Sequence, residues 1–253
     1  FMGRWSACLA PKLIDFAGVQ DGQRILDVGS GTGSLSHALV NRGGTTHVVG
    51  VDPVEAYVSF ARQAVSHPRA RFEVCAAESL PFGDESFDAT LSLLLLQDLA
   101  DPDRAVREMA RVTRTGGTVA ACQWDFQAGI PMFALLRQAA EAVAPQAVAR
   151  RRAEDGPINR TSLTDLERLW ITSGLSAVRT SALELLMEFA SFDDFWLPLL
   201  GGATPTSALM ATLNRETDGA LANALRDIIP NARSDGAFVL PARAWAVAGT
   251  AAR

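Results

Sequence analysis

The sequence contains few residues that could cross-link the chain or hold a metal. It has three cysteines and three histidines among 253 residues. Cys8, Cys75 and Cys122 show no paired spacing, and the last two fall in apolar runs typical of buried strands. We therefore expect reduced thiols and a cytoplasmic protein rather than a disulfide framework. The histidines form no cluster with cysteines or carboxylates at the spacing of metal ligands, so we expect no metal site.

Excess positive charge and long apolar runs are also missing. The formal net charge is −5 at pH 7, which gives no electrostatic footprint for a polyanion and argues against nucleic acid as a partner. The chain has no uninterrupted run of about 18 apolar residues, the length that a membrane-spanning helix needs. Its first residues lack the basic-then-apolar order of a signal peptide. We expect no membrane partner.

The composition and the alternation of segments are those of an α/β fold. Hydrophobic residues make up 48% of the chain, enough for a sizeable core. In the first half, strand-like runs alternate with helix-like segments, which predicts a parallel sheet covered by helices on both faces. The expected strands are Arg24–Val28, His47–Val51, Arg71–Cys75, Phe87–Leu93 and Thr118–Trp124.

The segment between the fourth and fifth expected strands carries the start and stop signals of a helix. Asp101 is a suitable N-cap, and Pro102 fits the first helical position. Apolar residues recur on one stripe between positions 106 and 112. The pattern predicts a helix that begins at Pro102 and stops at Gly116 and Gly117.

The second half alternates less regularly. We expect helices near Pro131–Ala144 and Leu163–Ser173, separated by a charged segment whose arginines, 150–152, form a solvated linker face. A strand over Ala177–Glu188, a mostly helical insertion broken by a loop at Gly201–Ser207, and a final strand over Ala237–Ala248 follow. No internal repeat is apparent, so we expect one domain with insertions.

The stretch ILDVGSGTGSLSHAL, residues 25–39, places glycines at every second position between an apolar run and a helix-like segment. Gly29, Gly31 and Gly33 permit positive φ and let a ligand approach the backbone without meeting a Cβ atom. The helix that follows adds N–H groups and the positive end of its dipole at the carboxyl edge of the sheet, where open α/β sheets bind ligands. A tight turn without a ligand is the alternative.

The spacing around this loop separates the ligand classes. A triphosphate loop needs Gly-Lys-Ser/Thr at its end, whereas Gly33 is followed by Ser34 and Leu35. The dinucleotide fingerprint needs a third small residue where this chain has Ser34, an imperfect fit. Asp52 ends the next strand, 19 residues after Gly33, where a carboxylate can accept two hydrogen bonds from a ribose diol. Helix capping by Asp52 before Pro53 is the alternative, and the two roles are compatible.

These motifs resemble a class I S-adenosylmethionine-dependent methyltransferase, similar to the ubiquinone and menaquinone biosynthesis methyltransferases (methyltransferase type 11 domain). The resemblance covers residues 24–125 and rests on Asp-x-Gly-x-Gly-x-Gly at 27–33 with VVGVDPVEAYVSFAR, ESLPF, SFD and RVTRTGG at fitting intervals. It implies a Rossmann-like, seven-stranded, mostly parallel sheet whose antiparallel last strand lies between the fifth and sixth. It also implies one methyltransferase domain over 1–253: a cofactor-binding core at 24–125, helical insertions covering the acceptor site at 126–235, and a final strand at 236–250.

The resemblance implies S-adenosyl-L-methionine as cofactor and assigns residues to its methionine end. Asp27 would lie near the amino group, directly or through water. The neighbouring loop residues would surround the methionine part, and residues after the fourth strand would pass beside the methionine end and the transferable methyl. The first set is Gly29, Ser30, Gly31 and Gly33; the second runs from Leu93 to Gln97.

The resemblance also assigns residues to the nucleoside end, and one of them departs from the family. Asp52 would bind the ribose hydroxyls, and Pro53 and Val54 would lie against adenine. The backbone N–H of Ala77 would reach the adenine edge. Relatives usually have Gly-Asp-Ala where this chain has Cys75-Ala76-Ala77, so the acid that accepts from the adenine amino group is replaced by Ala76. Glu78 substitutes for it only if the loop bends.

Methyl transfer from a sulfonium is an in-line displacement that depends chiefly on alignment and on exclusion of water, without a metal. The weak candidates for a polar or basic group at the acceptor are Gln97, Asp98 and Asp125. Of these, Gln97 can only orient an acceptor or the carboxylate of the cofactor. Residues 2–18 predict an amphipathic helix that in similar enzymes forms a lid over the cofactor, which would bring Arg4 to the methionine carboxylate.

We therefore expect an S-adenosylmethionine-dependent methyltransferase acting on a small organic acceptor, as a monomer or a homodimer. A protein that binds the cofactor or a derivative without transferring a methyl group is the alternative, suggested by Ala76. An NAD-dependent oxidoreductase is a third possibility, disfavoured by Ser34 and by the lack of a catalytic Tyr/Lys or His pair.

Overall fold

A computed structural model describes residues 3–42, 44–154, 162–201, 205–217, 219–229, 231–232 and 236–252; the side chains of 150–154 and 205–208 are not described. The chain divides into two compact units. The sheet unit comprises the described parts of 2–125, 161–183 and 243–253. The helical unit comprises those of 126–160 and 184–242.

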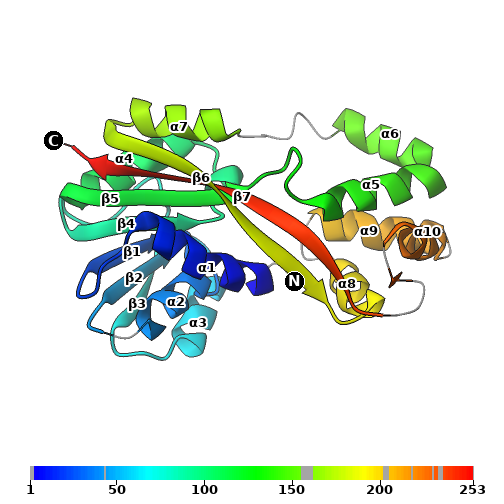
Figure 1. The fold of residues 1–253 in the computed structure, drawn as a ribbon, viewed down its shortest axis with the longest axis horizontal. Coiled ribbons are helices and arrows are strands. Elements are labelled where there is room, and N and C mark those ends of the chain that lie inside the picture. Colours follow the sequence, from blue (N-terminus) through cyan, green and yellow to red (C-terminus); the bar gives the residue numbers. More distant parts are fainter. Residues whose placement is uncertain are drawn as a thin grey trace. The chain divides into compact units, whose positions relative to one another are not determined.

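The sheet has seven strands in the order β3-β2-β1-β4-β5-β7-β6 (Figure 1). Strands β1 to β5 pair in parallel, and β7 runs antiparallel to β5, with Trp124 opposite Ala244 and Thr118 opposite Thr250. This arrangement confirms the predicted fold, including the antiparallel last strand between the fifth and sixth. The strands are β1 (Arg24–Val28), β2 (His47–Asp52), β3 (Ala70–Val74), β4 (Phe87–Leu93), β5 (Thr113–Trp124), β6 (Leu175–Phe189) and β7 (Phe238–Ala251).

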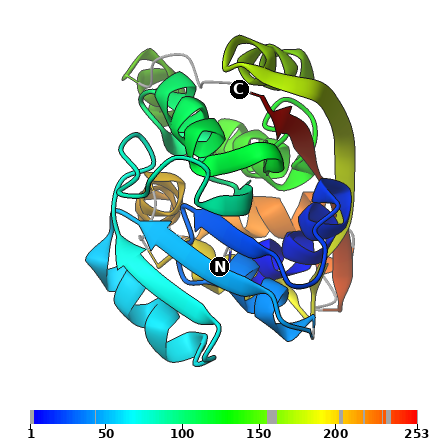
Figure 2. The same cartoon turned by 90° about the vertical axis from the view of Figure 1, so that its left-hand side faces the viewer.

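Helices cover both faces of the sheet in the sheet unit (Figures 1 and 2). On one face, α1 (Gly3–Ala17) packs on α2 (Ser34–Asn41), and α3 (Glu55–Ala64) packs on β2 and β3. On the other face lie α4 (Pro102–Val112) and α7 (Leu163–Thr172). The described helices of the helical unit are α5 (Pro131–Val143), α6 (Pro145–Glu154), α8 (Phe192–Leu199), α9 (Pro205–Glu216) and α10 (Ala220–Ile228).

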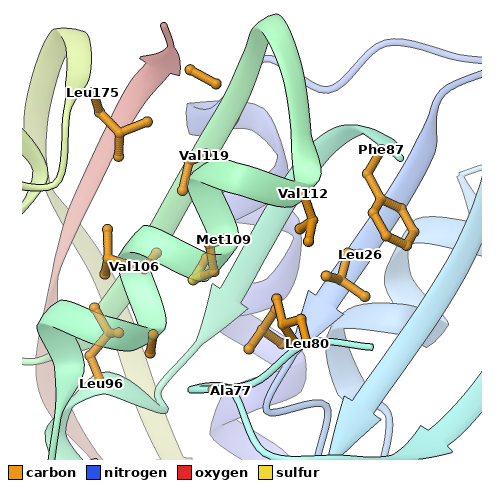
Figure 3. Close-up of a cluster of buried hydrophobic side chains, with 14 of the residues drawn as sticks. Leu26, Ala77, Leu80, Phe87, Leu96, Val106, Met109, Val112, Val119 and Leu175 are labelled. Carbon is orange, nitrogen blue, oxygen red and sulfur yellow. The ribbon is translucent and has the colours of Figure 1, made fainter. Parts of the chain in front are cut away.

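The core between α4 and the sheet fixes which way the side chains of β1 point. Val106, Met109 and Val112 of α4 pack over Leu26 and neighbouring strand residues, all nearly or fully buried (Figure 3). Because side chains alternate along a strand, the residues on either side of Leu26 face the α2 side of the sheet. The pleat of the strand therefore directs the side chain of Asp27 toward α2.

The predicted helix after the fourth strand begins where expected and ends earlier. The Asp101 carboxylate accepts from the Arg104 N–H at 2.9 Å, which confirms the N-cap. The helix, however, stops at Val112, and β5 begins at Thr113, five residues before the predicted strand. The Thr113 hydroxyl donates to the Met109 carbonyl at 2.7 Å, and Thr113 already pairs with Phe87 across the sheet.

The two glycines expected to stop this helix lie inside β5 instead. The register of β5 against β4 shifts between Phe87 and Ala89, so residues 114–117 form an irregularity in the strand. A Cβ on Gly117 would lie 2.5 Å from the Asp88 carbonyl oxygen. Close approach of two backbones, rather than helix termination, therefore requires the glycine at 117.

Other boundaries differ by a few residues. The predicted loop at 201–207 was too long, since α9 begins at Pro205; residues 202–204 lie outside the described part. The arginines at 150–152 belong to α6 rather than to a linker, and 155–156 of the charged segment are not described. Strand β6 extends beyond its predicted limits at both ends. Strand β7 begins one residue later than predicted and extends three residues further, to Ala251.

Candidate functional site

The glycine loop joins β1 to α2 at the carboxyl edge of the sheet. It folds against β2, because the N–H groups of Gly29 and Ser30 both donate to the Val51 carbonyl, at 2.8 and 2.9 Å. Gly33 has φ +92° at the start of α2, and a Cβ there would lie 2.8 Å from Val65 Cγ2. Gly31 has φ +52°, and no atom of the described residues lies within 4 Å of an added Cβ. One side of the loop is therefore packed, and the backbone at Gly31 borders open space.

Asp27, the acid that the sequence places before this loop, is fully buried on the α2 side of the sheet. Its Oδ2 accepts from the Ser36 hydroxyl at 2.6 Å and from the Ser36 N–H at 3.0 Å. Its Oδ1 has no hydrogen-bond partner among the described residues. Burial raises the pKa of Asp27 to about 7, opposed by the Ser36 hydrogen bonds and aided by the negative charge of Asp52. A buried carboxylate with one unused oxygen is suited to bind a cation with N–H donors.

Asp52 lies at the end of β2 beside the same loop. It is 7% exposed, its Oδ2 accepts from the Gly31 N–H at 3.0 Å, and its Oδ1 accepts from the Val54 N–H at 2.9 Å. The second bond spans Pro53 and forms a turn just before α3; the N-cap of that helix is Val54, without a side-chain hydrogen bond, so the alternative in which Asp52 caps the helix is wrong. Each carboxylate oxygen can accept more than one hydrogen bond, so both keep capacity for a diol.

The residues expected at the nucleoside end flank Asp52. Pro53 and Val54 are exposed, and the Cys75 N–H donates to the Asp52 carbonyl at 3.2 Å, which brings the end of β3 alongside. In the turn that follows, Ala76 is exposed and Ala77 is 5% exposed. Glu78 is half-buried.

The segment after β4 forms the wall opposite the loop. The side chain of Leu95 packs on Gly29, where an added Cβ would lie 2.7 Å from Leu95 Cδ2. The preceding residue, Leu94, has φ +63°, and its N–H donates to the Cys122 carbonyl at 2.8 Å. Leu93 is buried at the strand end. This apolar wall leaves the open side of the loop at Gly31.

Two of the three polar candidates for a role at the acceptor lie in the short 3-10 helix Leu96–Asp98. The Gln97 Oε1 accepts from the Trp124 N–H at 3.2 Å, which ties the amide to β5. Desolvation raises the pKa of Asp98, with a hydrogen bond from Gln97 acting in the opposite direction.

The third candidate, Asp125, is a buried carboxylate paired with the partly exposed guanidinium of Arg243. Its carboxylate is 2% exposed and accepts from Nε of Arg243 at 2.9 Å and from a terminal nitrogen at 2.5 Å. The Arg243 guanidinium also lies 4.4 Å from the Trp245 ring centroid. This geometry favours a structural role for Asp125, because removing a proton from an acceptor competes with the guanidinium.

The expected N-terminal helix is present as α1, which packs on α2, β4 and β5. The Arg4 guanidinium lies 4.3 Å from the centroid of the Trp5 ring, itself 2% exposed. The expected contact between Arg4 and a methionine carboxylate stays a prediction.

Sequence reasoning missed two residues that the structure places at this edge, Ser36 and Arg243. Ser36 is a short polar residue on the buried face of α2, three positions after Gly33. Its position in that helix was the available signal. Arg243 had none, because nothing in the sequence links it to Asp125, 118 residues earlier.

Two features are absent from the part of the chain that the structure describes. It contains no group of three or more histidines, cysteines or carboxylates placed to hold a metal ion. None of its helices is both long and apolar enough to cross a membrane. The expectations of no metal and no membrane partner stay predictions.

Residues 26–121 match the family described as "Methyltransferase domain". Among curated proteins, the ubiquinone/menaquinone biosynthesis C-methyltransferase UbiE of Bdellovibrio bacteriovorus is 33% identical over 127 residues, which cover 49% of this chain and 54% of that protein. The chain thus spans about half, or less, of the length of the curated relatives it matches.

Solved structures match over nearly the whole chain at low identity. The YcgJ protein from Bacillus subtilis has a TM-score of 0.62 and 22% identity, covering 99% of each chain. Phosphoethanolamine N-methyltransferase 2 of Haemonchus contortus, solved with S-adenosyl-L-methionine, has a TM-score of 0.59 and 18% identity, covering 97% of this chain and 53% of that one. The [4+2]-cyclase SpnF has a TM-score of 0.57 and 21% identity, covering 98% and 82%. At such identities the likeness shows the fold alone.

Proposed function

The chain carries a class I S-adenosylmethionine-dependent methyltransferase domain, and from this premise we propose that it transfers a methyl group from S-adenosyl-L-methionine to a small organic acceptor. The cofactor of this family has an amino-acid end and a ribose, and the glycine loop is flanked by an acid suited to each. When bound, it supplies a sulfonium methyl for in-line displacement.

The buried, unused Oδ1 of Asp27 is the observation that carries the proposal. An unpaired carboxylate oxygen inside a protein costs free energy unless a donor reaches it, so a fully buried one beside an open loop indicates a ligand that carries a cation. An α-ammonium group meets this requirement. The backbone at Gly31, with no described neighbour in the Cβ direction, gives such a ligand access.

Asp52 supports the assignment of the ribose. Its two oxygens are fixed by the Gly31 and Val54 N–H groups, so the carboxylate is held in one orientation before any ligand arrives. A pre-ordered acceptor loses little side-chain entropy when it binds a diol. Pro53 and Val54 then offer an exposed apolar surface next to it for a flat ring.

The protein contributes alignment and exclusion of water to the reaction. Leu95 forms an apolar wall over the Gly29 side of the loop, and Leu93 is buried at the end of β4, two residues before it. Gln97, whose oxygen is occupied by the Trp124 N–H and whose amide nitrogen donates to Asp98, keeps one further N–H, which suits it to orient an acceptor or a carboxylate. Asp98 is the better candidate for a general base, because Asp125 is committed to Arg243.

Calorimetry with S-adenosylhomocysteine and with NAD tests the cofactor assignment. We expect saturable binding of S-adenosylhomocysteine and no measurable heat with NAD. Binding of NAD alone would refute the proposal in favour of an oxidoreductase.

A second candidate is a cofactor-binding protein that does not transfer a methyl group. Ala76 is exposed and offers no acceptor to the adenine amino group, and a [4+2]-cyclase shares this fold, so the fold alone does not imply methyl transfer. The protein is incubated with S-adenosylmethionine and each member of a panel of phenols, amines and quinols, and mass spectrometry measures the S-adenosylhomocysteine formed. This assay distinguishes a methyltransferase from a protein that only binds the cofactor. Tight binding without turnover on any acceptor would favour the second candidate.

We further propose a cytoplasmic monomer or homodimer whose only partner is the small-molecule acceptor. Light scattering coupled to size exclusion, with and without S-adenosylhomocysteine, measures the oligomeric state. A defined higher oligomer would contradict this part of the proposal.

A further inference from the structure

Ser36 is bonded to the acid of the site, although the predicted site did not include it. It lies on the buried face of α2 with Leu35, Leu39 and Val40, and it is 0% exposed. A hydroxyl on an otherwise apolar buried face costs free energy unless it is hydrogen-bonded. Here the hydroxyl donates to Asp27 Oδ2 at 2.6 Å, so its presence is explained by this contact.

The contact is twofold, and it treats the two oxygens of Asp27 differently. Both the hydroxyl and the N–H of Ser36 donate to Oδ2, whereas Oδ1 has no partner among the described residues. The N–H would remain in any variant, but only the hydroxyl has a distance typical of a short bond to an ionised oxygen. Together the two donors fix the rotation of the carboxylate.

We propose that Ser36 is a positioning residue that holds Oδ2 of Asp27 so that Oδ1 alone is presented to the ammonium group of the cofactor. The inference rests on the proposed function for the identity of that cation. It adds a residue that reaches the ligand only through Asp27.

The same hydroxyl should also lower the pH above which Asp27 is ionised and able to accept a cation. Burial raises the pKa of Asp27, and the Ser36 hydrogen bonds oppose that rise by stabilising the ionised form. Among the described residues, the charged group that acts on it is Asp52 of the β2 end.

In the described part of the chain, the other elements around Asp27 bring no charge against it. Its neighbours in the sheet are Gly50 of β2 and Leu91 of β4. The titratable residue of α2, His37, is exposed. On α1, Arg4 and Lys12 are exposed, neither contributes to the shift of the Asp27 pKa, and Asp15 is paired with Arg42. Replacing the hydroxyl should therefore shift the ionisation of Asp27 upward without another charge to compensate.

The test compares S-adenosylhomocysteine affinity from pH 5.5 to 8.5 in wild type, Ser36→Ala and Ser36→Thr, with Ser34→Ala as the matched control. Ser34 is on the same helix and half-buried, and Asp27 takes its described hydrogen bonds from Ser36 instead. For Ser36→Ala we expect about tenfold weaker binding at pH 7 and a midpoint of the pH profile about one unit higher, so that the loss is larger at pH 6 than at pH 8. Ser36→Thr keeps the hydroxyl and should restore most of the affinity and the wild-type midpoint.

A second readout does not need the ligand. The carboxyl stretch of Asp27, isolated for each Ser variant as the infrared difference between that variant and the same variant carrying Asp27→Asn, should titrate at higher pH in Ser36→Ala than in Ser34→Ala. If Ser36→Ala does not fold, Ser36→Cys, which keeps the volume but donates weakly, gives the same comparison with a smaller shift.

The outcomes separate the role of Ser36 from the proposed function. Absence of S-adenosylhomocysteine binding in wild type would refute the proposed function. Binding in wild type, with an unchanged midpoint in a folded Ser36→Ala or Ser36→Cys, would overturn the role of Ser36 and leave the proposed function intact. A uniform loss of affinity at every pH that Ser36→Thr does not reverse would indicate a packing defect and also overturn it.

Discussion

Replacing Asp52 with alanine should lower both the free energy of unfolding and the affinity for the cofactor, and the two losses can be measured separately. In the free protein, the carboxylate holds the Gly31 and Val54 N–H groups at 3.0 and 2.9 Å. A hydrogen bond to a charged group contributes about 1.5–3 kcal/mol. Since Gly31 is half-buried and Val54 is 43% exposed, water replaces part of each bond. We expect a loss of about 2 kcal/mol in the free energy of unfolding, or about 4–8 °C in Tm.

Cofactor binding should be weakened in this variant by more than the loss of the hydrogen bonds that hold the loop. If Asp52 binds the ribose diol, Asp52→Ala removes the acceptor for those hydroxyls as well, a loss of about 1.5–3 kcal/mol in binding, or about 10- to 150-fold in Kd for S-adenosylhomocysteine. The negative charge of Asp52 also raises the pKa of Asp27, so the pH midpoint of binding should move down. Calorimetry across pH measures both effects.

Asp101→Ala is the matched control, because it removes a helix cap far along the chain from the loop. It should lower the unfolding free energy by about 1 kcal/mol and leave the Kd unchanged. A Kd for Asp52→Ala within twofold of wild type, with a clear fall in Tm, would refute the ribose assignment and show that the residue only holds the loop and the start of α3.

Four further predictions concern the same sheet edge. Below pH 7, S-adenosylhomocysteine binding should release a proton from Asp27, whose pKa is raised to about 7, and above pH 7 this release should fade; calorimetry in buffers of different ionisation enthalpy measures it, and a release independent of pH would contradict it. The folded protein holds this proton at pH values where the unfolded chain has lost it. The unfolding free energy of the ligand-free protein should therefore decrease as the pH rises from about 4 to about 7. Gly33→Ala should cost about 2 kcal/mol in urea unfolding, since φ is +92° and the new methyl would lie 2.8 Å from Val65; an unchanged midpoint would argue against the loop geometry. Arg243→Leu should destabilise by roughly 2–3 kcal/mol, because the buried Asp125 loses its partner while the partial exposure of Arg243 lets water weaken the pair, and Kd should change little; a loss of affinity at unchanged stability would instead give Asp125 a role at the ligand.

The sequence predicted the positions of most strands because those signals are local, whereas the order of the strands in the sheet and the role of Asp27 were implied by the family resemblance. Apolar runs marked β1, β2 and β4, and Asp52 was predicted from its position at the end of a buried strand beside the glycine loop. The parallel topology then brings such ends to one edge of the sheet.

Contacts between residues that are far apart in the sequence could not be predicted from local patterns. The glycines after α4 are typical of a helix stop, yet Gly117 is required because the Asp88 carbonyl of the neighbouring strand β4 lies against it. Likewise, the pairing of Arg243 with Asp125 depends on the register of β7 against β5, which no local pattern encodes. The assignment of site residues to cofactor atoms stays a prediction until binding is measured.

The left-handed backbone at Leu94 has a consequence for protein engineering. An L-residue with φ +63° is less stable than glycine by about 1–2 kcal/mol, so Leu94→Gly would relieve backbone strain. The same substitution would free the segment that carries Leu95, whose side chain packs on Gly29 and walls the loop. Selection of thermostable variants by stability alone could therefore accept Leu94→Gly and make the site less rigid. Position 94 should be held fixed in such a selection.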